Sequence, residues 1–256
     1  MTSPDAWMRE FEKLMIEAGR IGLAARADLG RELKPDGSVV THGDRAVQEF
    51  LEPRLTELVP AAFWGEEGSR SEPNDEGLWV VDPIDGTSNY AFGSPIWGVS
   101  AGLVRGESVR IGGVYLPELG RLFAVDSEGR ATLNGRPMEP VPAGPIQPYE
   151  LVGIGETARR AAPRFPFPGK PRLLGSFVVE ACFVAEQSLR AMVGMREKLY
   201  DVAPSVGILR ALGAEVRYLD GTPFSLAELA DGRPIDRPWI MAPRGSFDRL
   251  AEPTEA

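Results

Sequence analysis

The sequence is poor in cysteine and histidine, with one residue of each type, Cys182 and His42. A lone cysteine cannot form an internal disulfide, and its apolar neighbours indicate a buried thiol, so we expect a reducing compartment. A single histidine excludes the zinc patterns that need paired cysteines or histidines, and a Ser-His-Asp triad would have to use His42. We interpret His42 as a surface or loop residue rather than a catalyst.

Basic residues and long apolar runs are also scarce. The 28 Lys and Arg residues against 37 Asp and Glu residues give a net charge of −9, which disfavours sequence-independent binding to nucleic acid or to an anionic membrane. No stretch approaches the roughly 20 apolar residues of a membrane span, and acidic residues interrupt the N-terminal segment before it can form a targeting signal. The sequence therefore predicts a cytoplasmic protein with no nucleic-acid or membrane partner.

The first half of the chain predicts two helices followed by a sheet. Its 256 residues, 43% of them hydrophobic, suffice for a folded core. Apolar residues at helical spacing predict amphipathic helices over Trp7–Ala25 and Ala46–Leu58. Short runs rich in β-branched residues then predict a largely antiparallel sheet, with strands Ala61–Gly65, Leu78–Asp82, Ile96–Leu103, Val109–Tyr115, Leu119–Val125 and Ala131–Leu133.

The second half predicts strands and helices in alternation. The strands are expected at Leu151–Ile154, Leu173–Leu174, Glu215–Leu219 and Trp239–Ala242, and the helices at Thr157–Ala162, Phe177–Ala191 and Val202–Leu212, with a loop over Pro163–Pro171. The proline-rich segment Pro137–Pro148 is the best boundary between halves. We therefore predict an α+β protein in which an α+β subdomain (1–145) precedes an α/β subdomain (146–256).

The most informative stretch of the sequence is Asp82-Pro83-Ile84-Asp85-Gly86-Thr87. An apolar strand leads into Asp82, which the proline keeps extended, and Asp85 follows across a tight turn, so both carboxylates can face one point. Neighbouring ionised carboxylates repel unless a cation lies between them, and oxygen ligands favour Mg²⁺, Mn²⁺ or Ca²⁺ over zinc. The carbonyl oxygen of Ile84 is a further possible ligand.

An anion site is encoded beside this candidate metal site. Gly86 and Thr87 are expected to open a short helix, whose free N–H groups would meet a phosphate. The alternative interpretation of the same residues is an Asx turn that links a strand to the next element. The six residues alone leave both interpretations open.

Other acidic residues have a structural interpretation beside a functional one. Glu66 and Glu67 end another apolar strand, and alternation would point them to opposite sides, so that one binds metal while the other serves a second metal or a water. Such pairs in loops are often only solvated. Asp201 is a natural N-cap for the helix that follows, and Asp44 could cap a helix that begins at Arg45.

In their order along the chain, these pieces resemble the inositol monophosphatase family of sugar phosphatases. The resemblance covers nearly the whole chain through Val40-Thr41-x-x-Asp44, Gly65-Glu66-Glu67, Asp82-Pro83-Ile84-Asp85-Gly86-Thr87, Gly175-Ser176 and Asp201-Val202-Ala203. It implies a layered αβαβα fold and Mg²⁺-dependent hydrolysis of a small phosphate monoester by a metal-activated water. It also implies a homodimer.

The resemblance also assigns roles to single residues. Two to three Mg²⁺ ions, for which Mn²⁺ is a possible substitute, would be held by Glu66, Glu67, Asp82, the Ile84 carbonyl, Asp85 and Asp201. Asp44 and Thr87 would lie beside the activated water, and Glu66 would share in catalysis. The backbone amides of Gly86 and Thr87 would receive the phosphate, and Ser176 and Asp201 would contact the substrate.

The chain departs from the family pattern on the side of the alcohol. Gly194 stands where inositol-specific members carry a glutamate that approaches the sugar hydroxyls, and Phe177 replaces a small residue after Gly-Ser. Tyr200 stands where the family has tryptophan, which is a mild change. We therefore expect phosphatase chemistry on a substrate that need not be myo-inositol 1-phosphate.

Several other functions remain as hypotheses. Within the family, the substrate could be fructose 1,6-bisphosphate, histidinol phosphate or a 3′-phosphoadenosine phosphate. A phosphatase of the haloacid dehalogenase type is disfavoured, because its two aspartates stand two residues apart and Asp82 and Asp85 stand three apart. A protein of another class would bind a phosphorylated ligand, or regulate a partner, without turnover.

Overall fold

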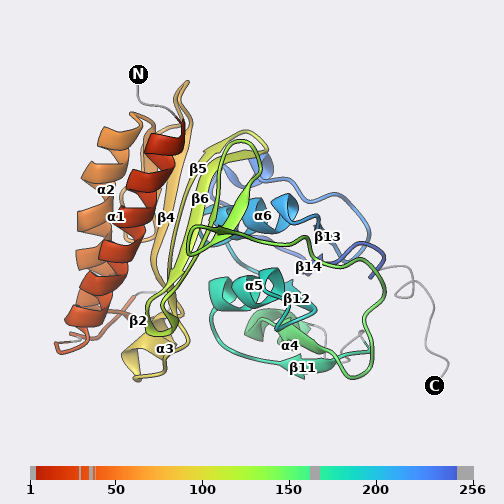
Figure 1. Cartoon of the computed structure of the whole chain (residues 1–256). Helices are drawn as coiled ribbons and strands as arrows, with labels where there is room; N and C mark the ends of the chain where they lie inside the picture. The colour runs from red at the N-terminus through yellow and green to blue at the C-terminus, as the bar shows by residue number, and fades with distance from the viewer. Residues whose placement is uncertain (1–3, 29, 35–36, 38, 162–167, 247–256) are drawn as a thin grey trace.

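The chain folds into five layers in the order helix, sheet, helix, sheet, helix, as the family resemblance predicted (Figure 1). The structure is a computed structural model that describes residues 4–28, 30–34, 37, 39–161 and 168–246. Among these residues, no helix combines the length and the apolar character that crossing a bilayer requires.

Two long helices form the first layer, on the outer face of the larger sheet (Figure 1). These are α1 (Pro4–Ala25) and α2 (His42–Leu58). Helix α1 buries Phe11, Met15 and Ala18, which recur every three to four residues and so share one face. Helix α2 begins earlier than its apolar pattern predicted, because Thr41 and not a later residue caps it.

The second layer is a seven-stranded sheet in the order β3-β4-β5-β6-β7-β8-β9. Its first pair, β3 and β4, is parallel, and the remaining neighbours are antiparallel. The strands are β3 (Ala62–Gly65), β4 (Leu78–Asp85), β5 (Gly98–Arg105), β6 (Ser108–Leu116), β7 (Arg121–Val125), β8 (Ala131–Leu133) and β9 (Arg136–Pro137). The predicted largely antiparallel sheet is confirmed.

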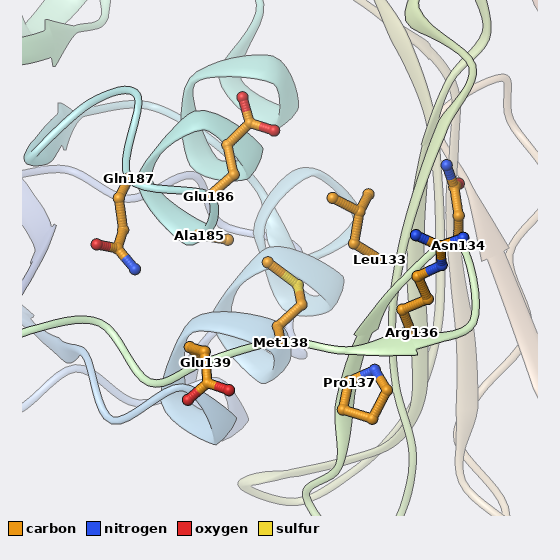
Figure 2. A pocket seen from close by; sticks show the side chains of 9 residues that line it. All are labelled: Leu133, Asn134, Arg136, Pro137, Met138, Glu139, Ala185, Glu186 and Gln187. Atoms are coloured by element: carbon orange, nitrogen blue, oxygen red, sulfur yellow. The ribbon is translucent and has the colours of Figure 1, made fainter.

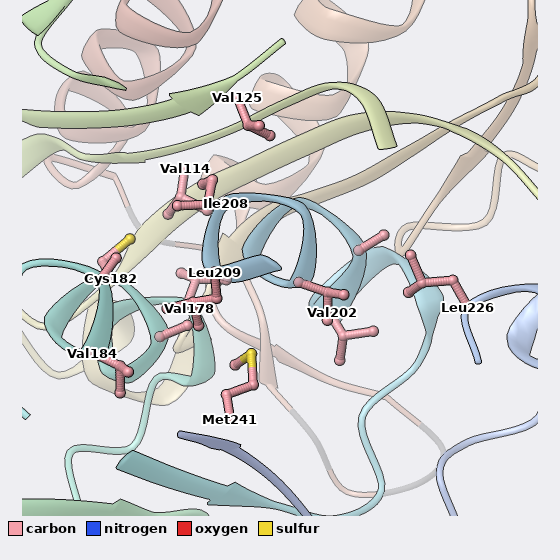
Figure 3. Packing of buried hydrophobic residues seen from close by; sticks show 14 of the residues in the cluster. Val114, Val125, Val178, Cys182, Val184, Val202, Ile208, Leu209, Leu226 and Met241 are labelled. Atoms are coloured by element: carbon pink, nitrogen blue, oxygen red, sulfur yellow. The ribbon is translucent and has the colours of Figure 1, made fainter. Parts of the chain in front are cut away.

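The middle layer consists of α5 (Phe177–Ala185) and α6 (Leu199–Ala211), which lie between the two sheets. Both helices are apolar over most of their surface, as a helix covered on two sides requires. Figure 3 shows α6 residues Ile208 and Leu209 beside Val114 of the large sheet, with Met241 of the small sheet below them. One hydrophobic core thus joins both halves of the chain.

The small sheet has the order β11-β10-β12-β14-β13 and is covered on its far side by α4 (Glu156–Ala161). Its strands are β10 (Leu151–Ile154), β11 (Lys170–Arg172), β12 (Ala191–Gly194), β13 (Glu215–Tyr218) and β14 (Trp239–Ala242). Strand β10 runs parallel to β11 and β12, whereas β14 is antiparallel to its two neighbours. Smaller elements are β1 (Glu32–Leu33), β2 (Val39–Val40), α3 (Thr87–Ala91) and the 3-10 turns Pro117–Leu119 and Ala227–Leu229.

Two predictions for the second half are wrong. The helix expected over Phe177–Ala191 ends at Ala185, because Gln187 takes a positive φ of 67° and the chain returns as the buried strand β12. The strand expected at Leu173–Leu174 lies instead at Lys170–Arg172, and its first two residues belong to the segment Pro163–Pro171 that was predicted to be a loop. Residues 163–167 of that loop, and Ala162 at the end of the helix predicted over Thr157–Ala162, lie outside the described residues.

A substitution at Leu209 tests whether the middle layer is the centre of the hydrophobic core. Its side chain is fully buried, so Leu209→Ala should lower the free energy of unfolding by about 2–5 kcal/mol through lost burial and a residual cavity. Leu33, which is 76% exposed, gives the matched control, and Leu33→Ala should change stability by less than about 0.5 kcal/mol. Urea unfolding measures both, and equal effects would contradict this description of the core.

Candidate active site

The site forms where strand β4 ends and the short helix α3 begins. Asp82 and Asp85 both belong to β4, so the tight turn expected between them is wrong: the pairing with β5 shifts register there, as in a β-bulge. The amide of Ile84 donates to Oδ1 of Asp82 at 3.0 Å, which is the Asx-type contact of the alternative interpretation. The bulge therefore contains the hydrogen bond of an Asx turn, and both aspartates remain buried.

Gly86 makes the transition from strand to helix possible. It has a φ of 84°, in the left-handed region, and precedes Thr87, the first residue of α3. A Cβ atom at Gly86 would lie 2.9 Å from Cβ of Ser176 and 3.0 Å from the carbonyl oxygen of Ile96. The sequence prediction of a short helix opening at this point is confirmed.

Asp44 lies inside the protein and reaches Thr87. It is the third residue of α2 and not its cap, because the helix begins at His42 behind Thr41. Its Oδ2 accepts from the backbone amide of Thr41 at 2.8 Å and from the Thr41 hydroxyl at 2.6 Å. Its Oδ1 lies 3.4 Å from the hydroxyl of Thr87, which donates to the Ile84 carbonyl at 2.9 Å. The predicted Asp44 and Thr87 pair is thus in contact.

Ser176 joins the two halves of the chain at Asp85. As the N-cap of α5 it donates its hydroxyl to Oδ1 of Asp85, which also accepts from the amide of Val178 at 3.2 Å. The residue predicted to bind substrate therefore contacts a predicted metal ligand. Burial raises the pKa of Asp85 above its usual value, and these two hydrogen bonds oppose that rise.

Asp201 enters the site from the first turn of α6. It was expected to be the N-cap, but the helix begins two residues earlier, and Oδ2 of Asp201 accepts from the backbone amide of Lys198 at 2.7 Å. Tyr200 beside it packs edge-to-face on Trp64, with ring centroids 5.3 Å apart. The aromatic contact holds the start of α6 against the end of β3.

Glu66 and Glu67 follow β3 and face the same cation. Nζ of Lys34 lies 3.0 Å from Oε1 of Glu66 and 2.6 Å from Oε1 of Glu67, so the expectation that the two side chains point to opposite sides is wrong. Both glutamates stand beyond the last strand residue, Gly65, where strand alternation no longer applies. Burial alone would lower the pKa of Lys34, but the two carboxylates raise it above its usual value.

The acidic side chains are close enough to raise one another's pKa values. Burial, and then the charge of Glu66, raises the pKa of both Asp82 and Asp201, and the charge of Asp85 adds to both. Burial also raises the pKa of Asp44 to about 6. Asp82 is 3% exposed and Asp85 8% exposed. The structure thus concentrates negative charge in a place that water does not screen.

These residues have the chemistry of a site for a hard divalent cation. All donors are oxygens, and a buried group of carboxylates gains most from a metal ion. In the part of the chain that the structure describes, no three His, Cys, Asp or Glu side chains lie close enough together to hold a metal ion as they stand. Each carboxylate of the site is held by the hydrogen-bond donors or the lysine described above. A bound ion would therefore have to draw the carboxylates together.

The sequence did not single out Glu180, a buried carboxylate that braces the neighbouring loop. It is 2% exposed, and Oε1 accepts from the amide of Leu174 at 2.8 Å. The carbonyl of Leu174 in turn accepts from the side-chain amide of Asn89 in α3 at 2.8 Å. Burial raises the pKa of Glu180 to about 7. Glu180 could have been identified from the sequence as a lone glutamate within an otherwise apolar helix.

Lys34 and Glu197 were also missed. No spacing in the sequence relates Lys34 to Glu66. Glu197 lies in the connection between β12 and α6, where Trp239 and Met195 bind its carboxylate. Both residues reach the site through contacts between elements that are distant in sequence.

A separate groove of about 600 Å³ contains none of the predicted site residues. Figure 2 shows it between the hairpin of β8 and β9 and the end of α5, with Leu133 and Met138 on one side and Glu186 on the other. Arg121 lies 2.6 Å from Oε1 of Glu186. The acidic site is therefore distinct from this groove.

Comparison with known proteins defines the class of the chain. A sequence model of the inositol monophosphatase family matches residues 7–239, so the chain belongs to this family. A fructose-1,6-bisphosphatase/inositol-1-monophosphatase of Aquifex aeolicus is 29% identical over 220 residues, which are 82% of this chain and 83% of that protein. The family is generally metal-dependent.

Solved structures have the same fold. The extragenic suppressor protein suhB from Bartonella henselae superimposes with a TM-score of 0.82 at 21% identity, covering 96% of each chain. A structure described as inositol monophosphate bound SaIMPase-II gives a TM-score of 0.76 at 21% identity, covering 94% of this chain and 90% of that chain. At these identities the likeness shows the fold alone.

The raised pKa values predict a pH dependence for the metal-free protein. Asp44 and Glu180 bind protons more tightly when folded than when unfolded, so their contribution to stability is complete below about pH 4 and is lost as pH rises through about 6–7. Urea unfolding in a chelator should show this loss. The free energy of unfolding of the wild type should fall between pH 4.5 and 8. Replacing Glu180 by Gln, which imitates the protonated form, should make this decrease smaller by about 2–4 kcal/mol.

The control for this prediction is Glu128→Gln, since that glutamate lies on the surface with its side chain 65% exposed. It should leave the pH dependence unchanged. An equal slope for the wild type and the Glu180→Gln variant would contradict the raised pKa.

Proposed function

We propose that the chain hydrolyses a monophosphate ester of a small polyhydroxylated alcohol, with Mg²⁺ as its cofactor. The membership of the family supports a phosphomonoesterase. The observation that carries the proposal is that the charges of Glu66, Asp85 and Asp201 all act on the buried Asp82, next to the contact between Asp44 and Thr87. A buried cluster of this charge is costly for a purely structural protein.

Two to three ions would be held by Glu66, Asp82, Asp85, Asp201 and the Ile84 carbonyl, with Glu67 beside them. Bound Mg²⁺ would neutralise the phosphate and acidify a water molecule to give a nucleophile near neutral pH. Mn²⁺ shares the preference for oxygen ligands and is expected to substitute. The predicted homodimer and cytoplasmic location stay predictions that rest on the family resemblance and the composition.

The protein's own groups would orient the nucleophile and the phosphate. Asp44 is held by two bonds from Thr41 and turns its other oxygen to the Thr87 hydroxyl, so this hydroxyl can hold a water molecule in a fixed direction. The amides of Gly86 and Thr87 lie at the start of α3, where N–H groups have no partner within the helix and can receive phosphate oxygens.

An inositol monophosphate is the leading substrate. The relatives include a solved structure described with inositol monophosphate bound, and a protein named for both fructose-1,6-bisphosphatase and inositol-1-monophosphatase activity. Fructose 1,6-bisphosphate, histidinol phosphate and 3′-phosphoadenosine phosphates are the alternatives within the family. Non-catalytic binding of a phosphorylated ligand is the alternative of another class.

Asp82→Asn tests the proposal of metal-dependent hydrolysis. Removing one charge from the centre of the cluster should weaken ion binding and lower kcat/KM by about 100-fold or more, since metal assistance is worth several kcal/mol. Phosphate release from myo-inositol 1-phosphate and 4-nitrophenyl phosphate, with and without Mg²⁺, measures this. Asp231→Asn, on the surface beside Arg233, is the matched control and should be as active as the wild type. Wild-type protein that is folded but inactive on both esters would favour the non-catalytic alternative.

Thr87 tests how the nucleophile is oriented. Thr87→Val keeps the shape of the side chain but removes the hydroxyl between Asp44 and Ile84, so kcat should fall by about 100-fold or more, while KM changes little. Thr87→Ser restores the hydroxyl and should recover most of the activity. Full activity in the Thr87→Val variant would show that the hydroxyl does not act in the reaction.

A further inference from the structure

A fixed carboxylate stands at the end of the small sheet, beside the acidic cluster. Glu197 turns back over β12, so that Oε1 accepts from the amide of Met195 at 3.0 Å and Oε2 from the indole N–H of Trp239 at 2.8 Å. A Cβ atom at Gly194 would lie 2.9 Å from each oxygen, and one at Gly155 would lie 3.6 Å from Oε1. The carboxylate thus covers strand ends that have no side chains of their own.

The surroundings of Glu197 fix its carboxylate in this place. Trp239 is 1% exposed, stacks on Phe224 with ring centroids 4.6 Å apart, and is tilted against Phe177 at 5.6 Å. The indole therefore cannot turn away from the glutamate. A donor locked by packing is the kind of support that holds a functional group in one geometry.

The backbone of the same connection is cross-braced. Arg196 adopts a φ of 83°, a conformation that side chains other than glycine rarely take, and its amide donates to the carbonyl of Ile235 at 2.8 Å. The amide of Ile235 donates back to the carbonyl of Glu197 at 2.8 Å. Strained residues held by such contacts gather at binding and catalytic sites.

Glu197 belongs to the small-sheet half of the chain, whereas the backbone amides proposed to hold phosphate belong to the large-sheet half. Asp85 and Asp201 both experience its charge, and Asp201 follows it by four residues on α6. The phosphate of a bound ester is expected at the end of β4 and the start of α3, in the large-sheet half. The alcohol of a bound ester would then extend toward the small sheet, at the carboxyl ends of the parallel strands β10 and β12.

We propose that Glu197 is a specificity-determining residue that accepts hydrogen bonds from hydroxyl groups of the substrate alcohol; this inference rests on the proposed function. Each carboxylate oxygen has two acceptor positions, Met195 and Trp239 use one on each oxygen, and the backbone amide of Glu197 itself also donates to the carboxylate. The remaining acceptor capacity can take a hydroxyl group of the substrate. A second phosphate at this place meets a negative charge and is rejected.

The inference therefore separates the substrates that the family allows. It favours polyol monophosphates with free hydroxyls, such as an inositol monophosphate, over bisphosphates. The absence of side chains at Gly155 and Gly194 leaves the carboxylate as the polar group presented by these strand ends.

Glu197→Gln is the decisive variant, because it keeps the shape but removes the charge and half of the acceptor capacity. We expect kcat/KM for myo-inositol 1-phosphate to fall about 10–100-fold, the range for a hydrogen bond to a charged group, and that for 4-nitrophenyl phosphate to change less than about twofold. Discrimination against fructose 1,6-bisphosphate should also weaken. Glu186→Gln, a half-buried carboxylate in the separate groove, is the matched control and should change none of these values.

Equal losses on inositol 1-phosphate and 4-nitrophenyl phosphate would assign Glu197 a purely structural role and overturn the inference, as would no loss on either. If the Glu197→Gln variant fails to fold, Trp239→Phe removes the N–H donor together with the pyrrole part of the indole. Once its fold has been checked, it should give the same selective loss, with equal losses again contradicting the inference. A wild type without turnover would sink the proposed function but not this inference. Calorimetric titration with inositol 1-phosphate and with inorganic phosphate would then decide, since only the former should bind more weakly to the variant.

Discussion

The repulsion among buried carboxylates is the constraint on which the rest of this structure depends. Asp82 and Asp85 come from the large sheet and Asp201 from the middle layer. The charge of Asp85 raises the cost of ionising both Asp82 and Asp201, and the charge of Asp201 adds to the cost for Asp82. In water such groups would separate and stay hydrated. Here the packing of α6 against β4 keeps them together, so the hydrophobic core shared by the two sheets holds the acidic site in place.

Much of this arrangement can be predicted from the sequence. The rest cannot, for physical reasons. The residue pattern predicts the strand that leads to Asp82 and the helix that opens at Thr87, and the family resemblance predicts the five layers. Periodicity does not predict where a helix ends if every residue is buried, and it therefore missed the strand at Ala191–Gly194. The partners of Glu66 and Glu67 depend on Lys34, which only the folded chain brings near.

Prediction of the alcohol pocket from the sequence has a similar limit, as Gly194 shows. Position by position, the sequence has glycine where inositol-specific relatives have glutamate, and this pointed to a changed alcohol pocket. In the structure a carboxylate lies over Gly194 after all, because Glu197 reaches back from three residues downstream. A comparison of aligned positions does not detect this carboxylate, because Glu197 stands at another position in the sequence.

Lys34 shows how the site is balanced without a metal ion. Its ammonium group supplies one positive charge to Glu66 and Glu67, whereas the charges acting on buried Asp82 are those of other carboxylates. A divalent ion near Glu66 would thus compete with a lysine that is already paired, but near Asp82 it would meet uncompensated charge. Because coulombic gain is largest where charge is least compensated, ions should bind first at Asp82 and Asp201 and only later at Glu67. Such an order would make the first ion a link between the large sheet and α6, and would couple metal binding to the stability of the contact between the two halves.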